Sequence, residues 1–220
     1  MSFKLHDYVL SGNCYKVRLL AQLLEVSYTV NPVDFHPGKA HKSPSFLALN
    51  PHGTLPVLES GDTVLTDSAA MLVWIAQQHD KQHTWWPIND AECLAMTVQW
   101  LGFSSQLTES IGQLRLHTML NRPADAHGLR RQSIRHLREL ENHLTEQSIR
   151  GQAFLCGKQP TVADIACFAY TALSPDAGLE HTLYPGIRGW LHRIRCLEGF
   201  LTMPGIYEAH ETRNEHTAAS

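Results

Sequence analysis

A serine at the junction of two sequence patterns is the residue best placed to do chemistry in this chain. Residues 3–9 form a short β-prone run, and Val17, Leu20 and Leu24 then recur at helical spacing. Ser11 is therefore expected at a helix N-terminus, where free backbone N–H groups and the positive end of the helix dipole favour an anion. Because no glycine-rich phosphate motif surrounds it, a thiolate is a better candidate for that anion than a phosphate.

A proline at the start of an apolar strand is the second functional feature. The turn-rich run 50–54 leads into Leu55-Pro56 and then into Val57-Leu58. Proline cannot donate to a sheet ladder, so Pro56 belongs at the strand start, and a cis Leu55-Pro56 bond would turn the Leu55 backbone outward. The exposed N–H and C=O of Leu55 would then bind an extended peptide as an added strand.

An acidic residue and a serine precede the next helical pattern. Asp67-Ser68 stands directly before Ala69, Leu72 and Ile75. Ser68 is expected to cap this helix and to make its N-terminus a second anion site, while Asp67 supplies a negative charge for an amine. A ligand with an amino acid head, a peptide bond and a thiol would suit all three segments.

The order of these segments resembles that of the cytosolic glutathione S-transferase family. The run over residues 38–51, followed by the Leu-Pro turn and the Asp-Ser pair, is similar to the glutathione site of the serine-type classes, especially phi and theta. The resemblance covers about residues 3–205. It implies an α/β thioredoxin-like N-terminal domain followed by an all-α C-terminal domain, with glutathione as the co-substrate. It also implies a cytoplasmic homodimer, active in detoxification, in which the first domain of one subunit meets the helical domain of the other.

The resemblance also implies roles for individual residues. Ser11 would activate the glutathione sulfur, and Asn13 would either orient the thiolate or cap the helix. The expected glutathione contacts, from the γ-glutamyl end to the glycine end, are Asp67 and Ser68, Leu55 with Pro56, and then His41, Lys42 and Thr54. Two of these positions depart from the family, which often has Glu where Asp67 stands and Gln where Thr54 stands.

The composition of the chain excludes several classes of function. Its 220 residues are 43% hydrophobic, which is enough to bury a substantial core in one or two domains. A net charge of -3, with no basic run interleaved with aromatics, makes nucleic acid an unexpected partner. The five cysteines include no Cys-x-x-Cys pair, which is typical of a reduced, cytoplasmic protein. The sequence has no apolar signal core and no long apolar stretch, so no membrane span is expected.

The hydrophobic pattern changes once, near residues 79–89, a polar stretch that continues into two tryptophans and a proline. Before this stretch short β-prone runs alternate with helical runs, and after it nearly every run has helical period. We therefore expect an α/β domain over residues 1–78, a linker over 79–89, a helical domain over 90–205 and a polar tail over 206–220.

The helical part contains one strong helix-start signal. Thr161 is expected as an N-cap, with Asp164 three positions later in place of the usual Glu or Gln of a capping box. Asp164 is therefore interpreted as a folding residue rather than a catalytic acid. Elsewhere Leu137, Leu140 and Leu144 repeat between charged residues, which predicts an amphipathic helix with a solvated face.

An aromatic stripe follows the linker and suggests a pocket for a second substrate. Trp100, Phe103 and Leu107 lie at i, i+3 and i+7, so they share one helix face. We expect an apolar pocket for a small hydrophobic electrophile at this face, between the domains. The same spacing is equally typical of ordinary core, and it does not identify the electrophile.

Two other functions stay open from the sequence. Cys14 lies in the first turn after Ser11, where the helix dipole lowers a thiol pKa, so a glutathione-dependent disulfide oxidoreductase is one alternative. A non-catalytic binding protein with the same fold is the other, since fold does not determine function. His79 and His83 stand at i, i+4, but no glutamate accompanies them in a metalloprotease pattern, and no metal site is expected.

Overall fold

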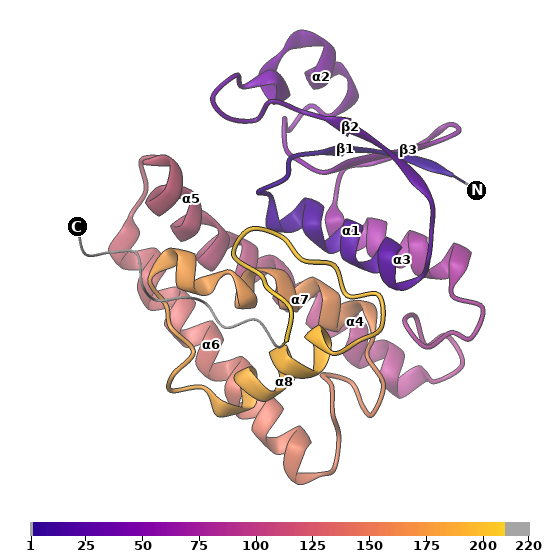
Figure 1. The fold of residues 1–220 in the computed structure, drawn as a ribbon, viewed down its shortest axis with the longest axis vertical. Helices are drawn as coiled ribbons and strands as arrows, with labels where there is room; N and C mark the ends of the chain where they lie inside the picture. The colour runs from indigo at the N-terminus through magenta and orange to yellow at the C-terminus, as the bar shows by residue number, and fades with distance from the viewer. Residues whose placement is uncertain (1, 210–220) are drawn as a thin grey trace.

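The N-terminal part of the chain is a four-stranded sheet with helices against it (Figure 1). The computed structural model describes residues 2–209. The strands are β1 Phe3–Asp7, β2 Tyr28–Pro32, β3 Val57–Ser60 and β4 Thr63–Leu65. They lie in the order β2-β1-β3-β4, with β1 parallel to β2 and the other pairs antiparallel. This is the thioredoxin-like arrangement that the family resemblance implies.

Strand pairing brings two of the predicted functional segments together. In the antiparallel pair of β1 and β3, His6 stands opposite Val57. The turn that follows β1 therefore lies beside the loop that precedes β3. These are the segments that carry Ser11 and Leu55-Pro56.

Helices lie on both sides of this sheet. Figure 1 shows α1 (Gly12–Leu23) and α3 (Ser68–His79) together on one side, and α2 (Pro44–Leu49) on the other. A 3-10 turn, Ala40–Lys42, precedes α2. Apolar side chains of α1 and α3 are fully buried in one cluster with Phe3, Leu5 and Leu58 of the sheet; they include Leu19, Leu20, Leu72 and Ile75.

The rest of the chain is helical. Its helices are α4 Ala91–Leu107, α5 Gln113–Leu120, α6 Ala126–Ile149, α7 Val162–Ala172 and α8 Pro185–Arg195, with a π-helical turn at Thr108–Gly112 and a 3-10 turn at Ser174–Ala177. Every residue of α7 is buried, because this helix packs against both α4 and α1. The predicted amphipathic helix is α6, whose Leu137, Leu140 and Leu144 face the core.

The larger hydrophobic core runs through both parts of the chain, from Phe3 and Leu5 in the sheet to Trp190 in α8, and a smaller cluster around Phe46 and Val57 lies in the sheet domain. One long-range hydrogen bond accompanies it, from the Tyr15 hydroxyl to the Leu201 carbonyl at 2.6 Å. The helical part therefore packs directly on α1, the helix that begins at the candidate serine. In the described part of the chain, no helix is both long and apolar enough to cross a membrane.

The segment between α3 and α4 contains neither helix nor strand, yet it is held in place. The Asp80 carboxylate accepts hydrogen bonds from the backbone N–H of Trp85 at 2.6 Å and of Gln82 at 3.2 Å. The Trp85 carbonyl in turn accepts from Val162 N at the start of α7.

At the C-terminal end, the polar tail predicted over residues 206–220 begins too early, because Ile206 is fully buried. Residues 210–220 lie outside the described residues.

The predicted capping box is confirmed, and it extends beyond the helix that it caps. Asp164 Oδ2 accepts from Thr161 N at 2.8 Å, while Oδ1 accepts from Leu155 N at 3.0 Å and from Trp190 Nε1 at 2.9 Å. One fully buried carboxylate thus joins α7 to the preceding loop and to α8. Burial raises the pKa of Asp164, and the hydrogen bonds that it accepts oppose that rise.

Asp164→Ala should lower the free energy of unfolding by about 3 kcal/mol or more, because three buried N–H donors lose their acceptor. The matched control is Asp125→Ala, which removes the exposed N-cap of α6 and its single bond from Gly128 N. That change should cost about 1 kcal/mol. Chemical denaturation of the two variants measures the difference, and equal losses would contradict the interpretation of Asp164 as a network residue.

Candidate functional site

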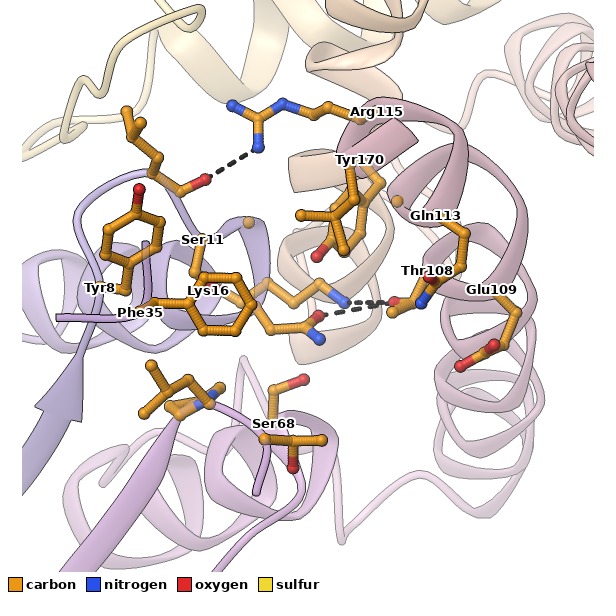
Figure 2. A pocket seen from close by; sticks show the side chains of 18 of the residues that line it. Tyr8, Ser11, Lys16, Phe35, Ser68, Thr108, Glu109, Gln113, Arg115 and Tyr170 are labelled. Carbon is orange, nitrogen blue, oxygen red and sulfur yellow. Dashed lines mark hydrogen bonds between the residues drawn. The ribbon is translucent and has the colours of Figure 1, made fainter. Parts of the chain in front are cut away.

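A cavity of about 380 Å³ lies where the sheet domain meets the helical part (Figure 2). One wall is formed by the turn before α1, the loop before β3 and the start of α3. The opposite wall comes from the end of α4, the π-helical turn, α5 and Tyr170 of α7. Of the predicted sulfur and glutathione residues, the cavity is lined by Ser11, Asn13, His41, Lys42, Thr54, Leu55, Pro56, Asp67 and Ser68.

Ser11 lies at the N-terminus of α1, as the sequence predicts, and the structure shows that it is the N-cap. Its backbone is extended, and its Oγ accepts a hydrogen bond from Cys14 N at 3.2 Å. A hydroxyl that accepts in this way keeps its own hydrogen for donation. Ser11 thus presents an O–H donor to the cavity at the positive end of a 12-residue helix.

Asn13 and Cys14 follow Ser11 in the first turn of α1, and the structure separates their roles. Asn13 does not cap the helix, since Ser11 does; its Oδ1 lies 3.5 Å from Thr108 Oγ1, across the cavity on the π-helical turn. Cys14 is fully buried, and burial raises the pKa of its thiol to about 12. Burial therefore outweighs the helix dipole at this cysteine.

The loop before β3 is held open toward the cavity. The Leu55-Pro56 bond is cis, as predicted. Within the described residues, neither the N–H nor the C=O of Leu55 makes a hydrogen bond to protein. Asn50, a residue that the sequence analysis missed, is fully buried and donates through Nδ2 to the carbonyl and the hydroxyl of Thr54, at 2.9 and 3.0 Å. The Asn50-Pro51 turn signal was the local clue to it.

The start of α3 differs by one residue from the sequence prediction. Asp67, not Ser68, is the N-cap: its backbone is extended and its Oδ1 accepts from Ala70 N at 2.9 Å. Aspartate caps a helix as well as serine does, and the helix begins directly after it. Ser68 is therefore the first helical residue and lines the cavity beside Asp67, whose Oδ2 makes no hydrogen bond to any described residue.

His41 and Lys42 form a platform under one end of the cavity. The His41 ring stacks on Phe35 with centroids 4.1 Å apart, and burial, followed by the charge of Lys42, lowers the pKa of His41. Lys42 Nζ donates to the carbonyls of His52 at 3.1 Å and Gly53 at 3.0 Å. Lys42 thus stabilises the turn that leads to Leu55.

Three cavity residues that the sequence analysis missed come from distant segments. Arg115 donates through Nη1 to the Leu10 carbonyl at 2.8 Å and through Nε to Asp176 Oδ2 at 3.0 Å. Tyr170 packs between α1 and the π-helical turn, and Lys16 reaches the same place from α1. No local signal predicts these contacts, because Leu10 and Arg115 are 105 residues apart.

The predicted electrophile stripe does not reach the cavity. Trp100, Phe103 and Leu107 belong to the buried core, and none of them lines the cavity. The apolar face of α4 points toward the helices behind it, while its small polar face, with Ser104 and Ser105, faces the cavity. Apolar periodicity marked the core side of this helix, which is the alternative that the spacing left open.

The described residues include no cluster of three or more His, Cys, Asp or Glu side chains placed to hold a metal ion. His79 ends α3, and His83 follows it in the irregular segment.

A thioredoxin-like domain joined to a helical domain, with a cleft suited to a thiol peptide at their junction, defines the class of glutathione transferases. The chain matches the profile of the glutathione S-transferase N-terminal domain over residues 5–83 and that of the C-terminal domain over residues 123–193. It belongs to the glutathione S-transferase family, whose members use glutathione as co-substrate.

Individual relatives give the same result. Glutathione S-transferase 3 of Zea mays is 30% identical over 206 residues, which cover 90% of each chain. Glutathione S-transferase theta-2 of Mus musculus is 26% identical over 96% of this chain and 87% of its own. The crystal structure of a glutathione S-transferase from Pseudomonas fluorescens superposes with a TM-score of 0.81 at 28% identity, covering 91% of this chain and 98% of the other. The chain is therefore a glutathione transferase.

Gly53→Ala should weaken glutathione binding by about tenfold, equivalent to about 1.4 kcal/mol. Gly53 has φ of +57°, and a Cβ there would lie 2.6 Å from Lys42 Nζ and 2.8 Å from the His41 carbonyl, so the platform must move. Gly61→Ala is the control, because Gly61 has φ of +56° with nothing within 4 Å of a Cβ. Calorimetric titration with glutathione should show a loss of affinity only for the first variant.

Proposed function

We propose that this enzyme activates the thiol of glutathione with Ser11 for attack on a small hydrophobic electrophile. The observation that carries this proposal is the position of Ser11, which caps α1 and lines the cavity with a hydroxyl that is able to donate a hydrogen bond. A charge-assisted hydrogen bond from this hydroxyl, together with the helix terminus, favours a thiolate. Stabilising the thiolate by two pKa units corresponds to about 2.7 kcal/mol, which these two interactions can supply.

The same cavity wall offers partners for the rest of the peptide. The unpaired backbone of Leu55, beside Pro56, would pair with the cysteinyl residue of glutathione. Asp67 and Ser68 would hold the γ-glutamyl amine and carboxylate at the start of α3. The platform of His41 and Lys42, with Thr54 nearby, would lie near the glycine carboxylate.

The electrophile would bind on the side of the cavity toward the helical part. Leu116 and Met119 of α5 line the cavity there. Tyr8 and Phe35 face them from the sheet domain, with their ring centroids 5.3 Å apart. An aromatic and aliphatic lining of this kind suits a small apolar molecule. These residues take the place of the Trp100 stripe.

Burial of Cys14 argues against the disulfide oxidoreductase. Thiol exchange needs an accessible thiolate, whereas Cys14 is fully buried and its pKa is raised to about 12. All five cysteines are free, which fits the reducing, cytoplasmic compartment that we propose for this enzyme.

Ser11→Ala should lower kcat by about a hundredfold and raise the pKa of enzyme-bound glutathione, with little change in affinity. Loss of the helix cap should cost about 1 kcal/mol of stability, which leaves the protein folded. Turnover of an aryl halide across pH, with thiolate absorbance of the binary complex, measures both effects.

Two further variants separate activation from binding. Asp67→Ala should raise the dissociation constant of glutathione more than it lowers kcat, because it removes a contact made equally in the ground and transition states. Cys14→Ala should leave turnover nearly unchanged. If Cys14→Ala abolished turnover while Ser11→Ala left the pH profile unmoved, the serine mechanism would be wrong.

We also propose that the enzyme is a homodimer. Exposed apolar side chains occur on both parts of the chain: Val64 on β4 is 43% exposed, and Val98 on α4 is 53% exposed. Pairing the first domain of one subunit with the helical domain of the other would cover both.

Light scattering at micromolar concentration should give the mass of two chains. Val98→Asp should shift the protein toward the monomer, because a charge would be buried at the interface. Ile149→Asp, at the exposed end of α6, serves as the control and should remain dimeric. A wild-type monomer would refute the homodimer.

A further inference from the structure

A buried lysine of α1 lines the cavity, and the proposed serine mechanism does not use it. Lys16 is only 2% exposed. Its Nζ donates to Thr108 Oγ1 at 3.4 Å and lies 5.1 Å from the centroid of the Tyr170 ring. Figure 2 shows Lys16 and Thr108 meeting across the cavity between Ser11 and Glu109.

The charge of Lys16 has no carboxylate partner among the described residues. Its hydrogen bond to a neutral hydroxyl and its contact with an aromatic ring only partly replace the water that a buried ammonium loses. Burial therefore lowers the pKa of Lys16 to about 8. Replacing such a lysine by an apolar side chain would be expected to stabilise the fold, so folding alone does not explain its position.

The groups that face Lys16 from neighbouring elements leave its charge uncompensated. From α7, Cys167 and Tyr170 are neutral near pH 8, because burial raises the pKa of each; that of Tyr170 is about 12. From the start of α3, Asp67 interacts with Lys16 through its charge but forms no ion pair with it. Glu109 lines the opposite wall and is exposed to solvent. The cavity therefore holds a cation that is poised to take an anion.

Helix geometry places this cation near the sulfur site. Side chains in a helix lean toward its N-terminus, so Lys16 extends back along α1 toward the first turn, where Ser11 and Asn13 stand. The contacts agree, since Thr108 Oγ1 is 3.4 Å from Lys16 Nζ and 3.5 Å from Asn13 Oδ1. The ammonium thus lies at the level of the Asn13 side chain, beside the end of the helix that Ser11 caps.

We propose that Lys16 stabilises the thiolate of bound glutathione by its charge, in addition to the hydrogen bond from Ser11. The inference rests on the proposed function and deepens it. The thiol proton leaves to solvent, and Lys16 keeps its own proton, so no bond to Lys16 forms or breaks. Coupling between the two charges is reciprocal: the thiolate raises the pKa of Lys16 by as much as the ammonium lowers that of the thiol.

The test compares the pKa of enzyme-bound glutathione in three variants. This pKa is measured from the thiolate absorbance across pH. Lys16→Met removes the charge and keeps an unbranched side chain, and it should raise the bound thiol pKa by about one to two units. Lys16→Arg keeps the charge and should retain most of the shift. Lys158→Met, at an exposed site away from the cavity, removes the same charge and should change nothing. An unchanged pKa in Lys16→Met overturns the proposal.

S-methylglutathione distinguishes the thiolate from the other anions of the ligand. It carries both carboxylates of glutathione but cannot ionise at sulfur. Lys16→Met should weaken binding of glutathione above the pKa of the bound thiol and leave binding of S-methylglutathione unchanged. An equal loss for both ligands would mean that Lys16 holds a carboxylate, and the proposal would be wrong.

A measurement on the wild-type enzyme covers the case in which the variants do not fold. The lysine resonance that titrates near pH 8 in an NMR experiment should move to higher pH with glutathione but not with S-methylglutathione. The absence of that difference would refute the inference. If the wild-type enzyme showed no thiolate absorbance with glutathione at all, thiol activation itself would fail; a lowered thiol pKa that persists in Lys16→Met would reject only the role of Lys16.

Discussion

Close packing of Tyr170 against two glycines holds the active end of α1 in place. A Cβ at Gly12 would lie 2.9 Å from the Tyr170 ring, and a Cβ at Gly112 would lie 3.0 Å from it. The first residue of α1 and the last residue of the π-helical turn can approach the same ring only because neither has a side chain. The separation of α1 from the π-helical turn, where Asn13 meets Thr108, therefore depends on α7 remaining buried between α1 and α4.

Polar contacts around Tyr170 and on the facing loop fix the two backbone segments that would contact a ligand. Arg115 ties the Leu10 carbonyl, directly before Ser11, to the helical part, and Asp176 holds the arginine. On the facing loop, Asn50 fixes Thr54, directly before Leu55. In both places a buried side chain holds the residue that precedes the proposed ligand contact, Ser11 or Leu55. The contact residue itself therefore remains available to a ligand.

Burial decides which groups near the start of α1 carry charge. Ser11, Cys14 and Lys16 all lie within two turns of the same helix end. Cys14 faces the core, where desolvation holds its thiol neutral, while Ser11 lines the cavity. Lys16 lies between these cases, since its Nζ is buried yet borders the cavity. The helix dipole acts on all three, and the solvation of each site determines what it does there.

Local signals in the sequence predicted the parts of the site that depend on nearby backbone groups. The place of Ser11 at a helix start, the Leu55-Pro56 turn and the Thr161 capping box each depend on hydrogen bonds or dihedral preferences within a few residues, so residue type and spacing indicate them directly. The error at the start of α3 was a single position, because Asp67 caps as well as a serine does.

Only the tertiary structure decided which side of α4 borders the cavity, and which distant residues meet there. Apolar spacing shows that Trp100 is on a buried face, but that spacing is the same for a core and for a pocket. Arg115 and Tyr170 come together with Ser11 through the packing of separate helices. The charge environment of Lys16 likewise follows from the helices that bury it, because desolvation is a property of the packed molecule and not of the local chain.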